Sequence, residues 1–188
     1  MGKSLQRGEK NYLALLTGEV KRILGDEKSH GFGHAKRTMD LAWRISMVEG
    51  GDIDVIRASA LLHDIGRENI FGDPGHGKRG AKVSREILER LQVPWNIEKI
   101  VSIVAGHDES GEEGKNEPIE LIIVRDADRL ELLRVSPEYL DLERLVTLES
   151  LRLVPYALSL HESDEDGWRL EAERAKRRAE EILRERDR

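Results

Sequence analysis

The spacing of apolar residues is the feature of this sequence that most restricts its fold. Apolar side chains recur every three or four residues through almost every segment, and no sustained alternation of apolar and polar residues occurs. Spacings of this kind place side chains on one face of an α-helix, whereas alternation is typical of a half-buried β-strand. The sequence therefore predicts an all-α fold, a compact bundle of helices.

Glycine-rich breaks separate the predicted helices. We expect helices over residues 9–24, 33–49, 53–65, 78–91, 95–105 and 119–133, and two or three more towards the end of the chain. Asp52 follows two glycines and is the expected N-cap of the third of these helices, while Gly66 is expected to end that helix in a left-handed conformation. Residues 72–77 and 110–118, which contain Gly and Pro among polar neighbours, are expected to be loops.

Chain length and cysteine content narrow the class of protein. A length of 188 residues suits a single domain, which we expect to span 1–188, with a core over 30–133 and terminal helices over 136–188. Cysteine is absent, so any metal must be held by imidazole and carboxylate groups. The sequence has no run of about 18 apolar residues and no signal-peptide pattern, so we expect a cytoplasmic protein without a membrane span.

The charge of the chain argues against nucleic acid as its main partner. The formal net charge is -6, whereas binding to a nucleic-acid backbone is driven by positive charge. Residues 174–178 are rich in Arg and Lys, but glutamates interleave with them in the terminal stretch 163–188. We expect this stretch to be a solvated helix rather than a nucleic-acid surface.

Histidines and aspartates occupy positions that the helical pattern turns inward. Five of the six histidines lie between His30 and His107, and the candidates among them share a helix face with apolar residues. Asp128 follows apolar residues on one helix face in the same way. A buried carboxylate loses hydration worth several kcal/mol unless a cation or a hydrogen-bond network replaces the water. A divalent metal ion bound by imidazole and carboxylate groups would supply that compensation.

Three segments carry a resemblance to a known family. They are SHGFGHAKR over 29–37, LLHDIGR over 61–67 and RDADRL over 125–130. Together they resemble the signatures of the HD superfamily of metal-dependent phosphohydrolases, over about 30–133. The resemblance implies a compact HD-domain bundle and a metal set of four residues, His34, His63, Asp64 and Asp128. Asp126 precedes the matching Ala-Asp pair, so we prefer Asp128 as the ligand.

The resemblance also implies roles for the remaining histidines. His76 and His107 fall where some HD proteins hold a second metal ion, with Asp64 as the bridge; alternatively, these two histidines only orient water, substrate or a ligand. His30 is expected to contact a metal ligand and not to bind the metal itself. His161 also lies on an apolar helix face, and we assign it no role.

Other charged residues near the motifs are candidates for binding substrate or moving protons. Four cations are candidates for binding a substrate phosphate: Arg37, Arg67, Lys78 and Arg79. Glu68 and Asp73 are the candidates for a general acid or base. Each of these residues could equally be an ordinary surface charge.

The sequence therefore predicts a hydrolase that uses metal-activated water to cleave a small phosphorylated metabolite or a nucleotide. The ion, or pair of ions, would be Mn, Fe, Co, Ni, Zn or Mg. The absence of a Gly-Tyr-Pro signature after the HD segment disfavours a cyclic dinucleotide phosphodiesterase of that subgroup. Two alternatives stay open, a di-iron oxygenase and a metal-containing sensor or ligand-binding module without catalysis. The sequence does not predict the oligomeric state.

Overall fold

The computed structural model describes residues 11–26, 30–69, 72–109, 116–160 and 166–187. Over these residues the protein contains helices and no strand, as the spacing of apolar residues predicts. The helices in chain order are α1 (Tyr12–Leu24), α2 (Phe32–Glu49), α3 (Ile53–Leu62), α4 (His76–Leu91), α5 (Ile97–Gly106), α6 (Ile119–Leu132), the short 3-10 helix η1 (Leu142–Arg144), α7 (Leu148–Arg152), α8 (Val154–Ser159) and α9 (Asp166–Arg186).

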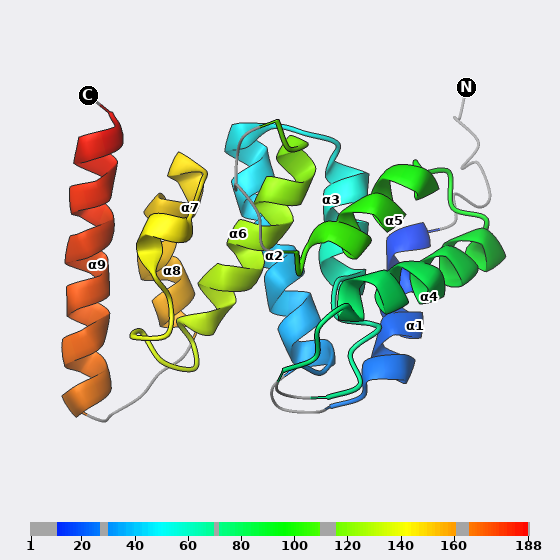
Figure 1. Cartoon of the computed structure of the whole chain (residues 1–188), viewed down its shortest axis with the longest axis horizontal. Helices are drawn as coiled ribbons and strands as arrows, with labels where there is room; N and C mark the ends of the chain where they lie inside the picture. The colour runs from blue at the N-terminus through cyan, green and yellow to red at the C-terminus, as the bar shows by residue number, and fades with distance from the viewer. Residues whose placement is uncertain (1–10, 27–29, 70–71, 110–115, 161–165, 188) are drawn as a thin grey trace, which may run out of the picture.

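Helix α2 lies at the centre of the bundle and packs against both α3 and α6 (Figure 1). On the other side of α3, the pair formed by α4 and α5 packs together, and α1 covers α3 and α4. The largest fully buried side chains come from all of these helices, among them Leu16, Leu41, Ile56, Leu88 and Leu130. One continuous apolar core therefore holds together the helices that carry the sequence motifs.

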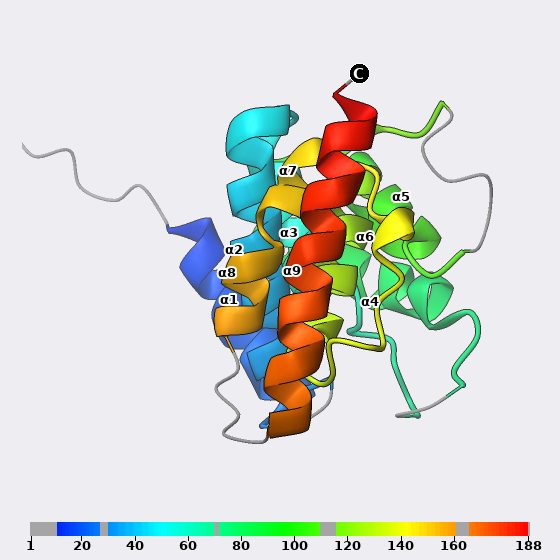
Figure 2. The same ribbon diagram turned by 90° about the vertical axis from the view of Figure 1, so that its left-hand side faces the viewer.

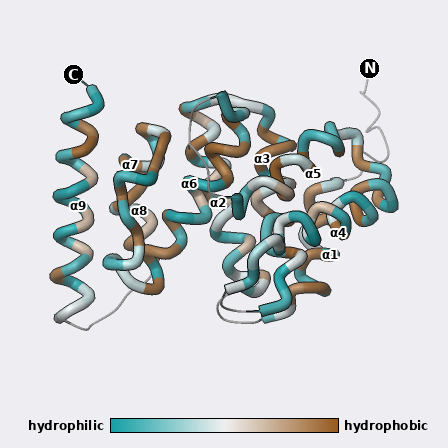
Figure 3. The backbone as a smooth tube through the Cα atoms, viewed as in Figure 1, coloured by the Kyte–Doolittle hydropathy of each residue, from teal (hydrophilic) through white to brown (hydrophobic). Residues whose placement is uncertain are grey.

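The last helices form a separate layer at one end of the molecule. Helix α9 packs on α7, α8 and η1, and Figure 2 shows it lying in front of α7 and α8 when that end faces the viewer. The tube of Figure 3 alternates between hydrophilic and hydrophobic segments along α9. The apolar stripe consists of Ala172, Ala175, Ala179 and Ile182, which are buried. The terminal helix is therefore solvated on its charged face and buried along this stripe, which joins the core.

The charged face of α9 agrees with the expectation from sequence. Arg174 pairs with Glu171, and Lys176 pairs with Glu173. Arg178 contacts Glu181 and also Glu143 of η1. Such pairs balance the positive charge of this face, which does not form an uncompensated basic patch.

Side-chain N-caps mark the starts of two helices, of which α5 begins two residues later than predicted. The side chain of Asp52 accepts hydrogen bonds from the amides of Asp54 and Val55, which makes it the predicted N-cap of α3. Asn96 caps α5 in the same manner, accepting a hydrogen bond from the amide of Lys99. These caps depend only on neighbouring residues, so the sequence is enough to find them.

The end of α3 differs from the prediction. The helix stops at Leu62 and not at residue 65, so His63 and Asp64 lie in the turn that follows it. Gly66 is not among the residues with positive φ, so the expected left-handed cap is wrong. A Cβ at Gly66 would lie 2.1 Å from the backbone nitrogen of Gly80. The glycine is required because α4 passes directly against this turn.

Several expectations fall on residues that the structure does not describe. His161 and most of the predicted loop over 110–118 lie outside the described residues. The loop expected over 72–77 is shorter than predicted, because α4 begins at His76. Within the described part of the chain, no helix is both long enough and apolar enough to cross a membrane.

Candidate metal centre

Five segments bring their motif residues to one place. His34 stands near the start of α2, and His63 and Asp64 follow the end of α3. His76 opens α4, His107 follows α5, and Asp128 lies on α6. All six predicted metal ligands therefore converge, although they are spread over almost a hundred residues of sequence. Three overlapping groups have ligand atoms within 4.8 Å of one another: His30, His34 and Asp64; His34, His63 and Asp128; and His63, Asp64 and His107.

Backbone hydrogen bonds fix which ring nitrogen faces the centre. The Nδ1 atoms of His63, His76 and His107 lie 2.8 Å from the carbonyl oxygens of residues 60, 73 and 104, respectively. A carbonyl oxygen only accepts hydrogen bonds, so each Nδ1 carries the hydrogen. His63 and His107 use carbonyls near the ends of α3 and α5, where a helix leaves such groups without amide partners. The Nε2 atoms of the three rings are consequently directed into the cluster.

The Nε2 atoms meet in two pairs. His34 and His63 approach with their Nε2 atoms 3.0 Å apart, and the Nε2 atoms of His76 and His107 are also 3.0 Å apart. When Nδ1 of a neutral imidazole carries the hydrogen, Nε2 has only a lone pair, and two lone pairs repel each other at this distance. A proton on one of the two Nε2 atoms, which the raised pKa of His34 favours in the first pair, or a metal ion between the rings removes this repulsion. The donor arrangement therefore fits a metal ion.

Asp64 joins the two pairs through its two carboxylate oxygens. Its Oδ2 lies 2.9 Å from Nδ1 of His30 and 3.6 Å from the Nε2 atoms of both His34 and His63. Its Oδ1 lies 3.1 Å from Nε2 of His76 and 3.8 Å from Nε2 of His107. The side chain is only 1% exposed. Burial by itself raises the pKa of Asp64, but the surrounding histidines outweigh it and hold the pKa well below its ordinary value.

Asp128 contacts both histidines of the first pair, His34 and His63, on the side of the cluster that is more exposed to solvent. Its Oδ1 lies 3.2 Å from Nε2 of His34 and 3.4 Å from Nε2 of His63, and 35% of the side chain is exposed. Burial raises the pKa of Asp128, but His63 and His34 bring it well below the usual value. Asp126 faces away and accepts hydrogen bonds from the amides of Val146 and Thr147. The structure thus brings Asp128 to the cluster and gives Asp126 a structural position, and the assignment of Asp128 as a ligand stays a prediction.

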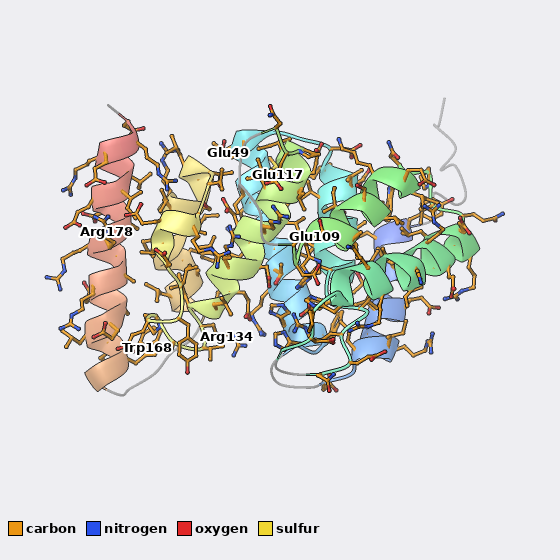
Figure 4. All side chains as sticks on the ribbon, in the orientation of Figure 1. Glu49, Glu109, Glu117, Arg134, Trp168 and Arg178 are labelled. Atoms are coloured by element: carbon orange, nitrogen blue, oxygen red, sulfur yellow. The ribbon has the colours of Figure 1, made fainter. Side chains whose placement is uncertain are left out.

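Glu131 is a buried residue of the centre that sequence reasoning missed. Its Oε2 lies 3.1 Å from Nδ1 of His34, and its Oε1 accepts hydrogen bonds from Arg37 and Arg134, both 2.7 Å away. Figure 4 shows Arg134 beside the C-terminal end of α6. Burial lowers the pKa of His34, but Asp128 and Glu131 together raise it to about 10. Glu131 lies one helical turn after Asp128, and this spacing is the only sequence signal that could have pointed to it.

The proposed acid–base residues do not reach the cluster. Glu68 is 72% exposed, and its closest ion-pair partner is Arg79 at 3.7 Å. Asp73 accepts hydrogen bonds from the amides of Glu68 and Asn69 and pairs with Arg79, and these contacts lower its pKa to about 2. Both carboxylates therefore have partners in or next to the turn before α4. Asp73 binds the backbone amides of that turn, and Glu68 lies near Arg79.

The four candidate phosphate-binding cations lie in different settings. Lys78 is 71% exposed and pairs with Glu109. Arg79 donates to the carbonyl of Gly66 and so ties the turn to α4. Arg67 reaches into the cluster, with its Nε 3.0 Å from Oδ1 of Asp64. Arg37 contacts Glu131, and its side chain is 30% exposed.

Two further residues hold the end of α5, where His107 lies. The buried guanidinium of Arg125 donates to the carbonyls of Gly106 and His107 and pairs with Glu117. Asp108 accepts a hydrogen bond from the amide of Gly77 and lies 3.3 Å from Nδ1 of His76. Sequence reasoning missed both, because nothing in the local pattern marks a residue that binds the end of another helix.

The family model for the HD domain matches residues 31–133, which is more than half of the chain. The chain belongs to the HD-domain family. The matched range contains every residue of the cluster except His30, and it extends from the start of α2 to the end of α6. The helices that position the six converging side chains are thus the helices of the HD domain itself.

Individual known proteins are also similar to this HD domain. A tRNA (cytidine(56)-2'-O)-methyltransferase from Thermoplasma volcanium is 33% identical over 110 residues, which cover 52% of this chain and 30% of that protein. The chain therefore matches less than a third of that relative's length. An HD-superfamily hydrolase from Bacillus thuringiensis is similar in structure with a TM-score of 0.49 and 24% identity, over 92% of this chain and 93% of the other. The Lin1889 protein from Listeria innocua has a TM-score of 0.49 and 17% identity, over 94% of each chain.

Proposed function

We propose that this HD domain is a metal-dependent phosphohydrolase that acts on a small phosphorylated metabolite or a nucleotide. The observation that carries the proposal is the pair of facing imidazoles on each side of Asp64. Nδ1 of three of the four rings is committed to a backbone carbonyl, and Nδ1 of His34 lies beside the carboxylate of Glu131. Both oxygens of Asp64 lie between the pairs, an arrangement that a divalent cation stabilises. The family match supports the same assignment.

In this proposal His34, His63, Asp128 and Oδ2 of Asp64 hold one metal ion. His76, His107 and Oδ1 of Asp64 form a second half of the centre. A bound divalent ion would lower the pKa of water and offset negative charge on a phosphoryl group. The protein supplies the fixed orientation of the imidazoles and the shielding from bulk water that strengthens these electrostatic effects.

The surroundings of Asp128 suit a phosphate group. Asp128 is the most exposed of the six converging residues, so substrate would enter beside it. Arg37 and Arg134 share the single carboxylate of Glu131 nearby, which leaves an excess of positive charge at that position. Arginine donors match phosphate oxygens in pairs, so Arg37 is our preferred phosphate contact among the four predicted cations. The exposed position of Lys78 and its pairing with Glu109 favour a surface role for that residue.

Cleavage of a substrate panel tests the proposal, with released phosphate measured for monoesters and nucleotides and the products of diesters separated by chromatography. The panel contains nucleotides, phosphomonoesters and cyclic dinucleotides, each with Mn, Co, Ni or Mg, and the metal-free protein serves as the blank. Transfer RNA is included because one relative's name refers to it. We expect at least one phosphorylated small molecule to be cleaved only when metal is present. We expect Asp64→Asn to reduce the rate by about a hundredfold or more, since loss of even a supporting residue costs about 10- to 100-fold.

A matched variant distinguishes the loss of a metal ligand from the general effect of removing one negative charge. Asp40→Asn removes a carboxylate from α2 that contacts Arg44 and Tyr156 and does not face the cluster. We expect it to keep metal content and rate close to those of the unchanged protein. A flat response over the whole panel by a metal-loaded, folded protein would contradict hydrolysis and favour the sensor or binding role.

The di-iron oxygenase is a second candidate, because His76 and His107 do join the cluster and complete a six-residue set. An oxygenase would consume dioxygen, and its partly oxidised form would give the electron-spin signal of a mixed-valence iron pair. Anaerobic iron loading followed by oxygen-uptake measurements distinguishes the two reactions. We expect no oxygen uptake. The entrance is lined by charged groups, Asp128 and Arg37, and such groups favour a charged substrate over an uncharged oxidisable one.

A further inference from the structure

The two halves of the proposed metal centre differ in their ligands, since only the first contains Asp128, and they also differ in the position of Arg67. Its Nε and one terminal nitrogen both lie 3.0 Å from Oδ1 of Asp64, and the terminal nitrogen is 3.1 Å from Nε2 of His76. These two acceptors are the ones that a second metal ion would use. Arg67 thus satisfies them with hydrogen bonds from a permanently positive group.

The hydrogen-bond directions at His76 support this arrangement. Nδ1 of His76 lies 2.8 Å from the carbonyl of Asp73, so Nε2 is free to accept a hydrogen bond from the guanidinium. The other oxygen of Asp64 has a different environment, because Oδ2 contacts only the three histidines His30, His34 and His63 among the described residues. Within that same part of the chain, no arginine or lysine pairs with Asp128.

The chain itself holds Arg67 in this place. Its amide donates to the carbonyl of Asp64, which folds the side chain back over the carboxylate three residues earlier. The turn between them cannot move far, because Gly66 lies directly against Gly80 of α4. A cation attached through a short, fixed turn is present at the site at a high effective concentration. A dissolved ion must displace it.

We propose that Arg67 is a built-in cation for the half of the centre formed by Asp64 Oδ1, His76 and His107. This HD domain then binds one metal ion tightly, between His34, His63, Asp64 and Asp128, and binds a second only weakly. The proposal rests on the assignment of a metal to the cluster, and it predicts the number of ions. It also disfavours chemistry that requires two equivalent ions.

Metal stoichiometry measured by titration calorimetry with Mn²⁺ tests the role of Arg67. We expect the unchanged protein to show one tight site per chain, and Arg67→Gln to gain a second. The second site should strengthen by at least about tenfold, because a unit charge about 4 Å away outweighs thermal energy even at an effective dielectric constant near 20. Arg67→Lys keeps a cation on the same turn and should stay closer to the unchanged protein.

Arg85→Gln is the matched control. Arg85 lies on α4 and pairs with Glu98 at the surface, so the substitution removes the same charge without reaching Asp64. We expect one tight site, as in the unchanged protein. A gain of a second site in this variant would mean that net charge, rather than the contact of Arg67 with Asp64, controls the stoichiometry, and would overturn the proposal.

The electron-spin spectrum of bound Mn²⁺ gives a readout that does not depend on any variant folding. At one equivalent or more of Mn²⁺, the unchanged protein should give the hyperfine-split signal of an isolated ion. A spin-coupled pair in the unchanged protein, or a single site in folded Arg67→Gln, would contradict the role of Arg67 while leaving the hydrolase proposal intact. Absence of any bound ion in both proteins would overturn the metal centre and this inference together.

Discussion

The orientation of His34 depends on one buried carboxylate. Glu131 lies 3.1 Å from its Nδ1 and is itself held by Arg37 and Arg134. The other three converging histidines use backbone carbonyls for the same purpose. A carboxylate behind a histidine fixes the ring and increases its basicity as a ligand, so Glu131 is a positioning residue for the proposed metal.

Substitution of Glu131 by Gln should therefore weaken metal binding without unfolding the protein. Gln keeps the size of the side chain and an oxygen for one arginine, but it removes the negative charge next to His34. We expect metal affinity to fall by about 10- to 100-fold. Titration calorimetry with Mn²⁺ measures the affinity, and thermal unfolding shows that the variant is folded.

Glu120→Gln is the control for Glu131→Gln. Glu120 is also a buried glutamate of α6, but it contacts Lys99 and the amide of Asp52 at the other end of the helix. We expect its substitution to leave metal affinity unchanged. An equal loss of affinity in both variants would mean that α6 is merely destabilised, and that Glu131 has no special relation to His34.

Close packing of two elements fixes the position of the HD turn. Gly66 in that turn and Gly80 on α4 approach so closely that a Cβ at Gly66 would lie 2.1 Å from one backbone atom of Gly80 and 2.6 Å from another. The same contact brings His76, at the start of α4, beside Asp64. Glycine therefore permits the close approach of the HD turn to α4, and the hydrogen bond from Arg79 to the carbonyl of Gly66 adds to that contact.

Gly66→Ala should destabilise the protein by about 3 kcal/mol or more, because the added methyl group meets backbone atoms that cannot rotate away. Gly18→Ala provides the comparison, since a Cβ at Gly18 in α1 meets nothing within 4 Å. The latter should stabilise the protein by about 0.5–1 kcal/mol, as alanine does inside a helix. Urea unfolding of the two variants measures both changes, and equal effects would refute the close approach at Gly66.

At the scale of the whole molecule, ion pairs connect helices that lie far apart in sequence. Glu19 on α1 accepts hydrogen bonds from both terminal nitrogens of Arg90, at the end of α4, at 3.0 and 3.1 Å. Contacts with Arg90 and Arg22 lower the pKa of Glu19 to about 2 from an ordinary value of 4.5. This pair connects α1 to the helix pair that carries His76 and His107.

The lowered pKa of Glu19 predicts how the stability of the protein depends on pH. The contribution of the ionised carboxylate is complete above pH 4.5 and is lost as the pH falls from 4.5 towards 2. Glu19→Gln should therefore be less stable than the unchanged protein at pH 6, and the difference should vanish near pH 2. Thermal unfolding of both proteins across this range tests the prediction, and a difference that is constant with pH would contradict it.

The sequence by itself determined the helical class and most helix boundaries, and its resemblance to the HD superfamily pointed to the six residues that converge. These features depend on short-range relations, such as apolar spacing within a helix, the N-cap of Asp52, and the bond from His63 to a carbonyl three residues earlier. The HD signatures belong to this local information, because the histidine and aspartate are neighbours in the chain.

Only the tertiary structure decided which atoms face each other. It showed that the two oxygens of Asp64 serve different histidine pairs, that Arg67 turns inward, and that Glu68 turns outward. It also brought Glu131 to His34 and Gly66 to Gly80. Apart from the contact of Arg67 with Asp64 three residues earlier, these contacts join separate segments of the chain, and their geometry follows from how the helices pack. The periodicity of a single segment carries no information about it.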